Sequence, residues 1–204
     1  MQLRYSPTSP YVRKVNISAM ELRLDDEIQR IPTNPWEADT DLPAHNPLGR
    51  VPALILDDGE TLFDSPVICE YLDSLREGAT LFPASGTERW QALRLQALGD
   101  GMLDASVLML IERARRPEEF RWAQWVERQE AVVGRALDTF EAEIGDFGGD
   151  FRIGQVVLSC GLGYLDFRFP ELDWRHAHPT LAGWFAKISE RPSVAATVPA
   201  DPPA

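Results

Sequence analysis

The sequence contains little that would serve disulfide bonding, metal binding or contact with nucleic acid. Only two of its 204 residues are cysteines, and neither belongs to a CxxC pair or to a spaced set of cysteines and histidines, so we expect no disulfide framework and no metal site. Cys69 and Cys160 lie in the apolar stretches VICEYL and LSCGLG, where a reduced, buried thiol acts as a small hydrophobe. The formal net charge of −12 would repel a phosphate backbone. We therefore expect small molecules or proteins as partners, and no nucleic acid.

Long hydrophobic runs are also missing from this chain. No apolar segment approaches the roughly 20 residues that a membrane-spanning helix needs. The opening MQLRY leads into no apolar stretch of the secretory type. These observations predict a cytoplasmic protein without a membrane partner.

Short strand-like and helix-like segments alternate up to residue 78. Strands are expected at residues 2–5 and 27–31 and in a hairpin over 51–63, whose turn is Asp58-Gly59. Helices are expected after Ser9-Pro10 and Ser65-Pro66, because a hydroxyl cap followed by proline starts helices well. The proline-rich stretch 32–47 predicts a loop without regular structure. The predicted order is therefore βαβ, loop, ββα.

The rest of the chain reads as helix after a connector rich in glycine, proline and serine. The closing residues RPSVAATVPADPPA contain four prolines and little core material, which predicts a loosely ordered tail. We expect an α/β domain over residues 1–78, a linker over 79–86 and an all-helical domain over 87–204. Its helices are predicted at 87–115, 118–144, 153–168 and 179–190.

Two motifs in the first domain carry a family resemblance. NPLGRVPAL and LFDSPVICEYL, joined by LFP to a helical domain, resemble the glutathione transferase superfamily over essentially the whole chain. TSPYVRK and GYLDFR make the chain most similar to the bacterial YibF-like branch. The resemblance implies an α/β thioredoxin-like N-terminal domain, an all-α C-terminal domain, glutathione as cosubstrate and a homodimer.

The resemblance also implies where glutathione binds. A cis Val51-Pro52 step would let the Val51 backbone pair with the cysteinyl part of the tripeptide, although VP could equally be a strand-edge proline. Ser65, at a helix N-terminus, would hold the γ-glutamyl carboxylate, and Asp64 would pair with the ammonium group. Many family members have Glu at that place. Arg50 would meet the glycyl carboxylate, unless its side chain is only exposed to solvent.

Thiol activation is the role that the superfamily gives to a residue between the first strand and the first helix. Ser9 stands where thiol-using members have Cys before Pro, and its hydroxyl together with the helix dipole would stabilise a thiolate. Tyr5 and Ser6 are the alternatives, and Ser9 could be a cap and nothing more. Without Cys at position 9, disulfide exchange of the glutaredoxin kind has no nucleophile.

The predicted function is a glutathione transferase that adds the thiolate to a small apolar electrophile, with peroxidase activity as a side reaction. The electrophile is expected between the first-helix loop and the start of the helical domain, against Tyr11, Met102 and Met109. Both methionines could instead be plain core residues. A non-catalytic binder of glutathione or apolar ligands and a regulatory protein that keeps the fold are the alternative functions. The natural electrophile cannot be read from this sequence.

Overall fold

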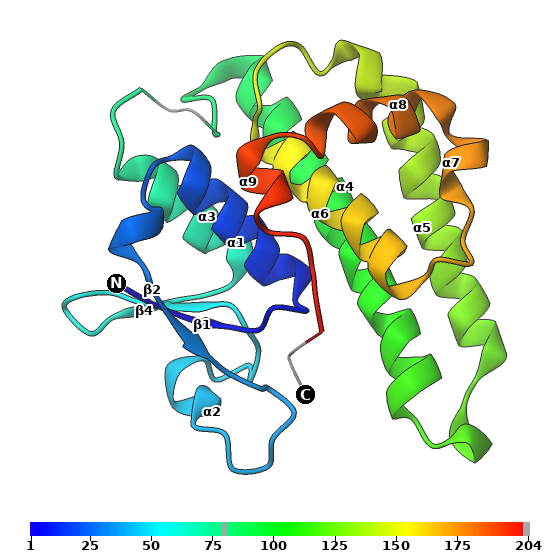
Figure 1. Ribbon diagram of the computed structural model, residues 1–204, viewed down its shortest axis with the longest axis horizontal. Helices are drawn as coiled ribbons and strands as arrows, with labels where there is room; N and C mark the ends of the chain where they lie inside the picture. The colour runs from blue at the N-terminus through cyan, green and yellow to red at the C-terminus, as the bar shows by residue number, and fades with distance from the viewer. Residues whose placement is uncertain (79–80, 202–204) are drawn as a thin grey trace. The chain divides into compact units, whose positions relative to one another are not determined.

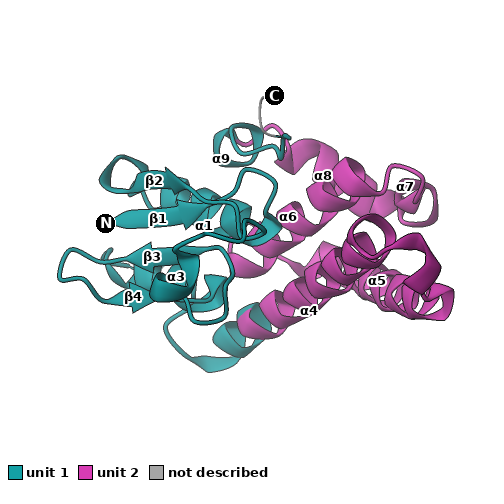
Figure 2. Cartoon of the chain, turned by 90° about the horizontal axis from the view of Figure 1, so that it is seen from below, with its two compact units in different colours: residues 1–92, 192–204 teal, residues 93–191 magenta. Residues whose placement is uncertain are grey.

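The computed structural model, which describes residues 1–78 and 81–201, divides into two units. The first consists of residues 1–92 together with the chain from residue 192 onward, and the second of residues 93–191 (Figure 2). The boundary between the units falls inside a helix that already begins at Gly86. Of the predicted linker, residues 79 and 80 lie outside the described residues.

A four-stranded mixed sheet is the centre of the first unit. Its strands are ordered β2-β1-β3-β4, with β1 parallel to β2 and antiparallel to β3, and β3 antiparallel to β4. This arrangement confirms the predicted βαβ and ββα order. The strands are β1 (Gln2–Tyr5), β2 (Gln29–Pro32), β3 (Ala53–Ile55) and β4 (Thr61–Leu62).

Two helices cover one face of this sheet, and a short helix lies on the other (Figure 1). α1 (Pro10–Glu21) and α3 (Ser65–Ser74) pack side by side. The helix on the other face, α2 (Leu42–His45), corrects the prediction that residues 32–47 have no regular structure. Leu42 is fully buried, so burial of one leucine fixes a turn of helix that the prolines around it concealed. A 3-10 turn, Asp25–Glu27, follows α1.

The start of α3 differs by one residue from the prediction. Asp64 is the N-cap, and Ser65 is the first residue in the helix. The cap carbonyl accepts the Ile68 N–H at 3.1 Å, while the Asp64 side chain makes no capping hydrogen bond. The cap-plus-proline pattern thus located the helix, with proline at its second position.

The second unit is helical, as predicted. α6 is its centre, since all thirteen residues from Ile153 to Leu165 are buried. None of the helices in the described parts of the chain combines the length and the apolar character needed to cross a membrane. The helices are α4 (Gly86–Leu110, beginning in the first unit), α5 (Ala123–Glu143), α6 (Ile153–Arg168), α7 (Trp174–Ala177) and α8 (Pro179–Ile188), with a π turn at Ile111–Arg115 and 3-10 turns at Glu118–Phe120 and Ile144–Asp146.

The C-terminal segment is ordered where a loose tail was predicted. It forms α9 (Pro192–Ala195), which packs on α1 within the first unit. Val194 is only 1% exposed, and its carbonyl accepts a hydrogen bond from Arg13 Nη2 at 3.1 Å. Composition alone missed this, because one buried valine and one buried arginine anchor an otherwise polar segment. Residues 202–204 of the predicted tail lie outside the described residues.

Candidate functional site

Three segments of the predicted glutathione site meet at one end of the sheet. β1 and β3 are antiparallel, with Arg4 opposite Ala53, so the end of β1 and the start of β3 lie at the same end of the sheet. β3 and β4 are also antiparallel, with Leu54 opposite Leu62, so the end of β4 lies at this same end of the sheet, and α3 begins three residues after it. The end of β1, the start of β3 and the start of α3 therefore lie together although they are far apart in the sequence.

The Val51-Pro52 peptide bond is cis, which confirms the geometry that the family resemblance implied. Asn46 holds the loop before it, since the buried Asn46 side chain donates from Nδ2 to the Arg50 carbonyl at 2.7 Å and accepts the Leu48 N–H at 3.0 Å. The Arg50 side chain is exposed. Sequence reasoning missed Asn46 as a positioning residue, although asparagine before Pro-Leu-Gly is a common turn signal.

Arg4 holds the neighbouring loop between β2 and α2. Its guanidinium is largely buried and donates to Thr33 Oγ1 at 2.8 Å and to Asp41 Oδ2 at 2.9 Å. The hydrogen bond from Arg4 holds the pKa of Asp41 below its usual value of 3.8, against the opposing effect of desolvation. This pair ties β1 to the loop that leads toward α2.

The start of α3 offers an anion site with a free carboxylate beside it. The first N–H groups of a helix have no partner inside the helix and carry partial positive charge. Ser65 is 1% exposed at this position. Asp64 is exposed, and its carboxylate makes no cap hydrogen bond and no ion pair to any residue in the described parts of the chain. An anion and a cation could thus be bound next to each other here.

Ser9 is the N-cap of α1, as predicted. Its Oγ accepts the Val12 N–H at 3.3 Å, and its own N–H donates to the Ser6 carbonyl at 3.1 Å. Because the cap uses the hydroxyl only as an acceptor, the O–H proton stays available for a second hydrogen bond. Val12 belongs to one buried apolar cluster with Leu42 and Val51, so the start of α1 and the cis-proline loop share a core. The capping role is therefore observed, and it does not exclude a second role.

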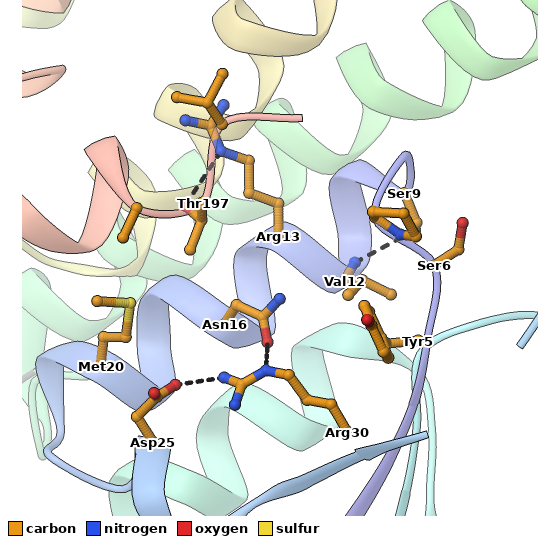
Figure 3. Close-up of a pocket in the computed structure, with 13 residues that line it drawn as sticks. Tyr5, Ser6, Ser9, Val12, Arg13, Asn16, Met20, Asp25, Arg30 and Thr197 are labelled. Carbon is orange, nitrogen blue, oxygen red and sulfur yellow. Dashed lines mark hydrogen bonds and ion pairs between the residues drawn. The ribbon is translucent and has the colours of Figure 1, made fainter. Parts of the chain in front are cut away.

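A pocket of about 300 Å³ opens beside Ser9 in the first unit (Figure 3). It extends along α1 toward Asp25, between the β1–α1 loop, the side of β2 and the C-terminal segment. Five segments of the chain contribute to its wall, since Asp25 comes from the 3-10 turn after α1. The lining residues are Tyr5, Ser6, Pro7, Ser9, Val12, Arg13, Asn16, Met20, Asp25, Arg30, Ala196, Thr197 and Val198.

Two arginines dominate the electrostatics of this pocket. Arg30 donates from Nε to Asn16 Oδ1 at 3.1 Å and forms an ion pair with Asp25 through Nη2. Arg13 donates to the Thr197 hydroxyl at 3.4 Å, as well as to α9. Figure 3 shows Arg13 reaching Thr197, and Arg30 lying between Asn16 and Asp25. Sequence reasoning missed Arg13, Asn16 and Arg30, because only the folded chain brings them together.

The residues predicted for the electrophile do not line this pocket. Met102 and Met109 belong to the second unit and are 1% and 0% exposed, as expected of plain core residues. Tyr11 is half-buried and absent from the pocket wall. An electrophile site at these three residues stays a prediction.

Both cysteines are buried thiols outside any disulfide, as predicted. Cys69 Sγ accepts a hydrogen bond from Ser18 Oγ at 3.3 Å. Within residues 1–78 and 81–201, no group of three histidine, cysteine or acidic side chains could hold a metal ion.

Comparison with protein families matches both parts of the chain. Residues 8–75 match the N-terminal domain of glutathione S-transferase, and residues 123–187 match its C-terminal domain. Among curated proteins, the uncharacterized GST-like protein YibF of Escherichia coli K12 is 32% identical over 204 residues, which cover 98% of each chain.

Solved structures agree in fold. A glutathione transferase family member from Pseudomonas fluorescens Pf-5 with bound glutathione is 45% identical with a TM-score of 0.92, covering 100% of this chain and 99% of that one. A structure of a family member from the same organism with bound S-(propanoic acid)-glutathione is 43% identical with a TM-score of 0.90, covering 98% and 100%.

Proposed function

The chain belongs to the glutathione S-transferase family, and from that premise we propose that it binds glutathione as the thiolate and adds the sulfur to a small electrophile. Similar proteins have been solved with glutathione bound. The proposal for this chain depends on its own residues, and one observation supports it most: the sheet registers bring the cis-proline loop, the start of α3 and the β1–α1 loop to one end of the sheet.

In the proposed complex, each charged group of glutathione has a partner. The Val51 backbone pairs with the cysteinyl unit, as an added strand would. The N–H groups at the start of α3 and the Ser65 hydroxyl hold the γ-glutamyl carboxylate, and Asp64 holds the ammonium group. Arg50, whose side chain is exposed, reaches the glycyl carboxylate. The uncommitted carboxylate of Asp64 supports this assignment, because no other cation engages it within the described residues.

Ser9 is our choice for the residue that activates the thiol. The hydroxyl keeps its proton for an O–H···S⁻ bond while it caps α1, and the helix N-terminus adds partial positive charge. Tyr5 and Ser6 line the same pocket and are the rival candidates. Disulfide exchange lacks a nucleophile here, because both cysteines are buried and position 9 is serine.

The product that we propose is a thioether. The family member solved with S-(propanoic acid)-glutathione holds such a conjugate, which supports addition at sulfur over other chemistry.

Calorimetric titration with glutathione tests the binding site. We expect Asp64→Ala to weaken binding by about 1.5–3 kcal/mol, the usual range for a hydrogen bond to a charged group, or roughly ten- to hundredfold. Asp64→Asn keeps the shape of the side chain and loses its charge, so glutathione should bind this variant nearly as weakly as it binds Asp64→Ala. Equal affinity in all three proteins would remove Asp64 from the site.

Thioether formation against a panel of small electrophiles then tests the reaction. A nitro-activated aryl chloride and an α,β-unsaturated ketone represent substitution and addition. If glutathione binds but no member of the panel reacts faster than in buffer, the protein is a glutathione binder and the transferase proposal fails.

We also propose that the protein acts as a cytoplasmic homodimer. In the first unit, Val67 of α3 and Trp90 of α4 are 48% and 69% exposed, and an ion pair between Glu70 and Arg89 joins the two helices. A surface with large exposed apolar side chains on two joined helices is a candidate interface. Light scattering should give the dimer mass, and Trp90→Glu should shift it toward the monomer. A monomer mass for the unmodified protein at micromolar concentration would refute the dimer.

A further inference from the structure

We propose that the connector between α4 and α5, residues 114–122, is a self-association surface to which a second copy of this chain binds by a two-fold contact. Figure 1 shows the connector joining the lower ends of these two helices. It belongs to the second unit, whereas Val67 and Trp90 of the proposed dimer face belong to the first. The contact does not depend on glutathione binding or transfer.

Exposed aromatic side chains are concentrated in this connector. Every residue from Ala114 to Gln124 is exposed, and Phe120 and Trp122 are 67% and 60% exposed. No other three-residue stretch within residues 1–78 and 81–201 has two large apolar side chains exposed. Aromatic residues and arginine are enriched at protein interfaces. The connector therefore has the composition of a contact surface.

Contacts within the chain hold the connector in one shape. Glu112 is 4% exposed and accepts hydrogen bonds from the Trp122 N–H and from Arg116 Nε, both at 2.8 Å. The Trp122 ring stacks on Trp125, with ring centroids 6.2 Å apart and ring planes at 19°. A side chain that is already held in place loses less conformational freedom when a partner binds. The connector is thus ordered for binding before a second copy arrives.

Charges of both signs lie beside these aromatic side chains without an ion pair. Glu118 and Glu119 are exposed, and their carboxylates have no partner in the described parts of the chain. Arg121 donates from Nε to the Arg116 carbonyl at 3.1 Å. Its charge acts on Glu112 through space, but among the described residues it forms no ion pair with a carboxylate. The connector therefore offers aromatic surface together with two negative charges and one positive charge.

A second copy complements this combination. In a two-fold contact the same patch is used by both copies, so each pairing between two different residues occurs twice. Arg121 of one copy would meet Glu118 and Glu119 of the other, and the reciprocal pairing would form at the same time. The aromatic side chains would pack between the two pairings. A partner with only acidic or only basic groups would meet like charge at some of these residues.

The contact should be weak, because it is small and both copies are acidic. Each chain carries a formal charge of −12, so two copies repel each other at long range. Interfaces that bury less than about 1,200 Å² in total are typical of transient complexes. We therefore expect association at high protein concentration and at about 0.15 M salt, which screens the repulsion beyond about 8 Å.

Sedimentation velocity in a Trp90→Glu background tests this contact separately from the dimer proposed for the first unit. The mass is followed from about 1 to about 500 µM protein. We expect it to rise with concentration toward twice the value at the lowest concentration. Because the rise is measured from that value, a first-unit dimer that survives Trp90→Glu does not change the test. A constant mass over this range would overturn the proposal.

Charge reversal tests whether the named residues meet. In the same background, Arg121→Glu and the double variant Glu118→Arg/Glu119→Arg each place like charges opposite each other, so each should self-associate at least about tenfold more weakly. An equimolar mixture of the two variants should associate again, because opposite charges then face each other in both pairings. A mixture that fails to associate, or single variants that associate normally, would overturn the two-fold contact.

Two further variants complete the test. Arg135→Glu makes the same charge change at an exposed residue of α5, about 18 Å along the helix from Ala123, and should associate like the background protein. Phe120→Ser removes exposed aromatic surface and should weaken association at least about tenfold. Equal losses in Arg121→Glu and Arg135→Glu would show that net charge controls association, and normal association of Phe120→Ser would exclude the aromatic contact. Thermal unfolding of each variant checks that the fold is retained.

Discussion

Replacing Ser9 separates two roles that one hydroxyl performs. The observed role is structural, because Ser9 Oγ accepts the Val12 N–H at the start of α1. The proposed role is chemical, because the same O–H would donate to the glutathione thiolate. Ser9→Ala removes both. Ser9→Gly removes the hydroxyl as well, but glycine is itself a tolerated cap residue.

The two roles have different magnitudes. Replacing a serine cap by alanine lowers the free energy of unfolding by about 0.5–2 kcal/mol, whereas replacing it by glycine lowers it by only about a few tenths of a kcal/mol. A hydrogen bond to a charged group is worth about 1.5–3 kcal/mol, which corresponds to a shift of about one to two units in the thiol pKa. With a bound thiol of pKa near 6.5, the thiolate share at pH 7 would fall from about three-quarters to between about 24% and 3%.

Thiolate absorbance of bound glutathione, measured against pH, gives the chemical effect directly. We expect Ser9→Ala and Ser9→Gly to raise the thiolate pKa equally and to lower transfer at neutral pH by about three- to twenty-five-fold, with glutathione affinity changed only a few-fold. Only Ser9→Ala should unfold at clearly lower denaturant concentration.

The glycine variant is decisive for this reasoning. If Ser9→Gly keeps both the thiolate titration and the rate of the unmodified protein, Ser9 is only a cap, and Tyr5 or Ser6 becomes the candidate. Ser9→Cys should introduce mixed-disulfide formation with glutathione, because a thiol would then occupy the helix N-terminus.

Three further predictions concern the second unit. A Cβ added at Gly99 would lie 2.5 Å from a valine side chain of α6, whereas a Cβ added at Gly134 would meet nothing within 4 Å. In chemical unfolding, we expect Gly99→Ala to be less stable than the unmodified protein by about 1–3 kcal/mol. Gly134→Ala should be more stable by about 0.5–1 kcal/mol. The Trp122 N–H donates to Glu112 at 2.8 Å and holds the pKa of the Glu112 carboxyl below its usual 4.5. The ionised carboxylate therefore stabilises the fold fully above about pH 4.5, and this contribution is lost as the pH falls through the lowered pKa. Glu112→Gln should reduce the loss of stability at acid pH, measured by urea unfolding at a series of pH values, and an unchanged loss would contradict the assignment. Burial raises the pKa of Tyr164 from 10.0 to about 12, so stability should decrease as the pH rises from about 10 toward 12; Tyr164→Phe should abolish that decrease and remove the latest phenol from an ultraviolet titration.

Local signals in the sequence located most elements of the fold. Ser9-Pro10 marked the start of α1 because a cap and a proline act within one turn. Asp58-Gly59 marked the hairpin turn for a similar reason, and the structure has Gly59 at φ +91° with the Glu60 N–H bonded to Asp58 Oδ1 at 3.0 Å. Such signals fail when burial elsewhere decides the outcome. The short helix α2 depends on burial of Leu42, which no neighbouring residue indicates.

The sequence by itself determined the order of strands and helices, the helical character of the second unit, the two motifs of the family and the cap at Ser9, because each depends on contacts between residues close in the chain. Only the tertiary structure decided that the C-terminal segment packs on α1 and that Asn16 and Arg30 share a pocket wall with Ser9. Those contacts join residues separated by 14 to 184 positions. Such contacts are stabilised when two surfaces far apart in the sequence are removed from water together. The local sequence pattern does not indicate which surfaces will pack against each other.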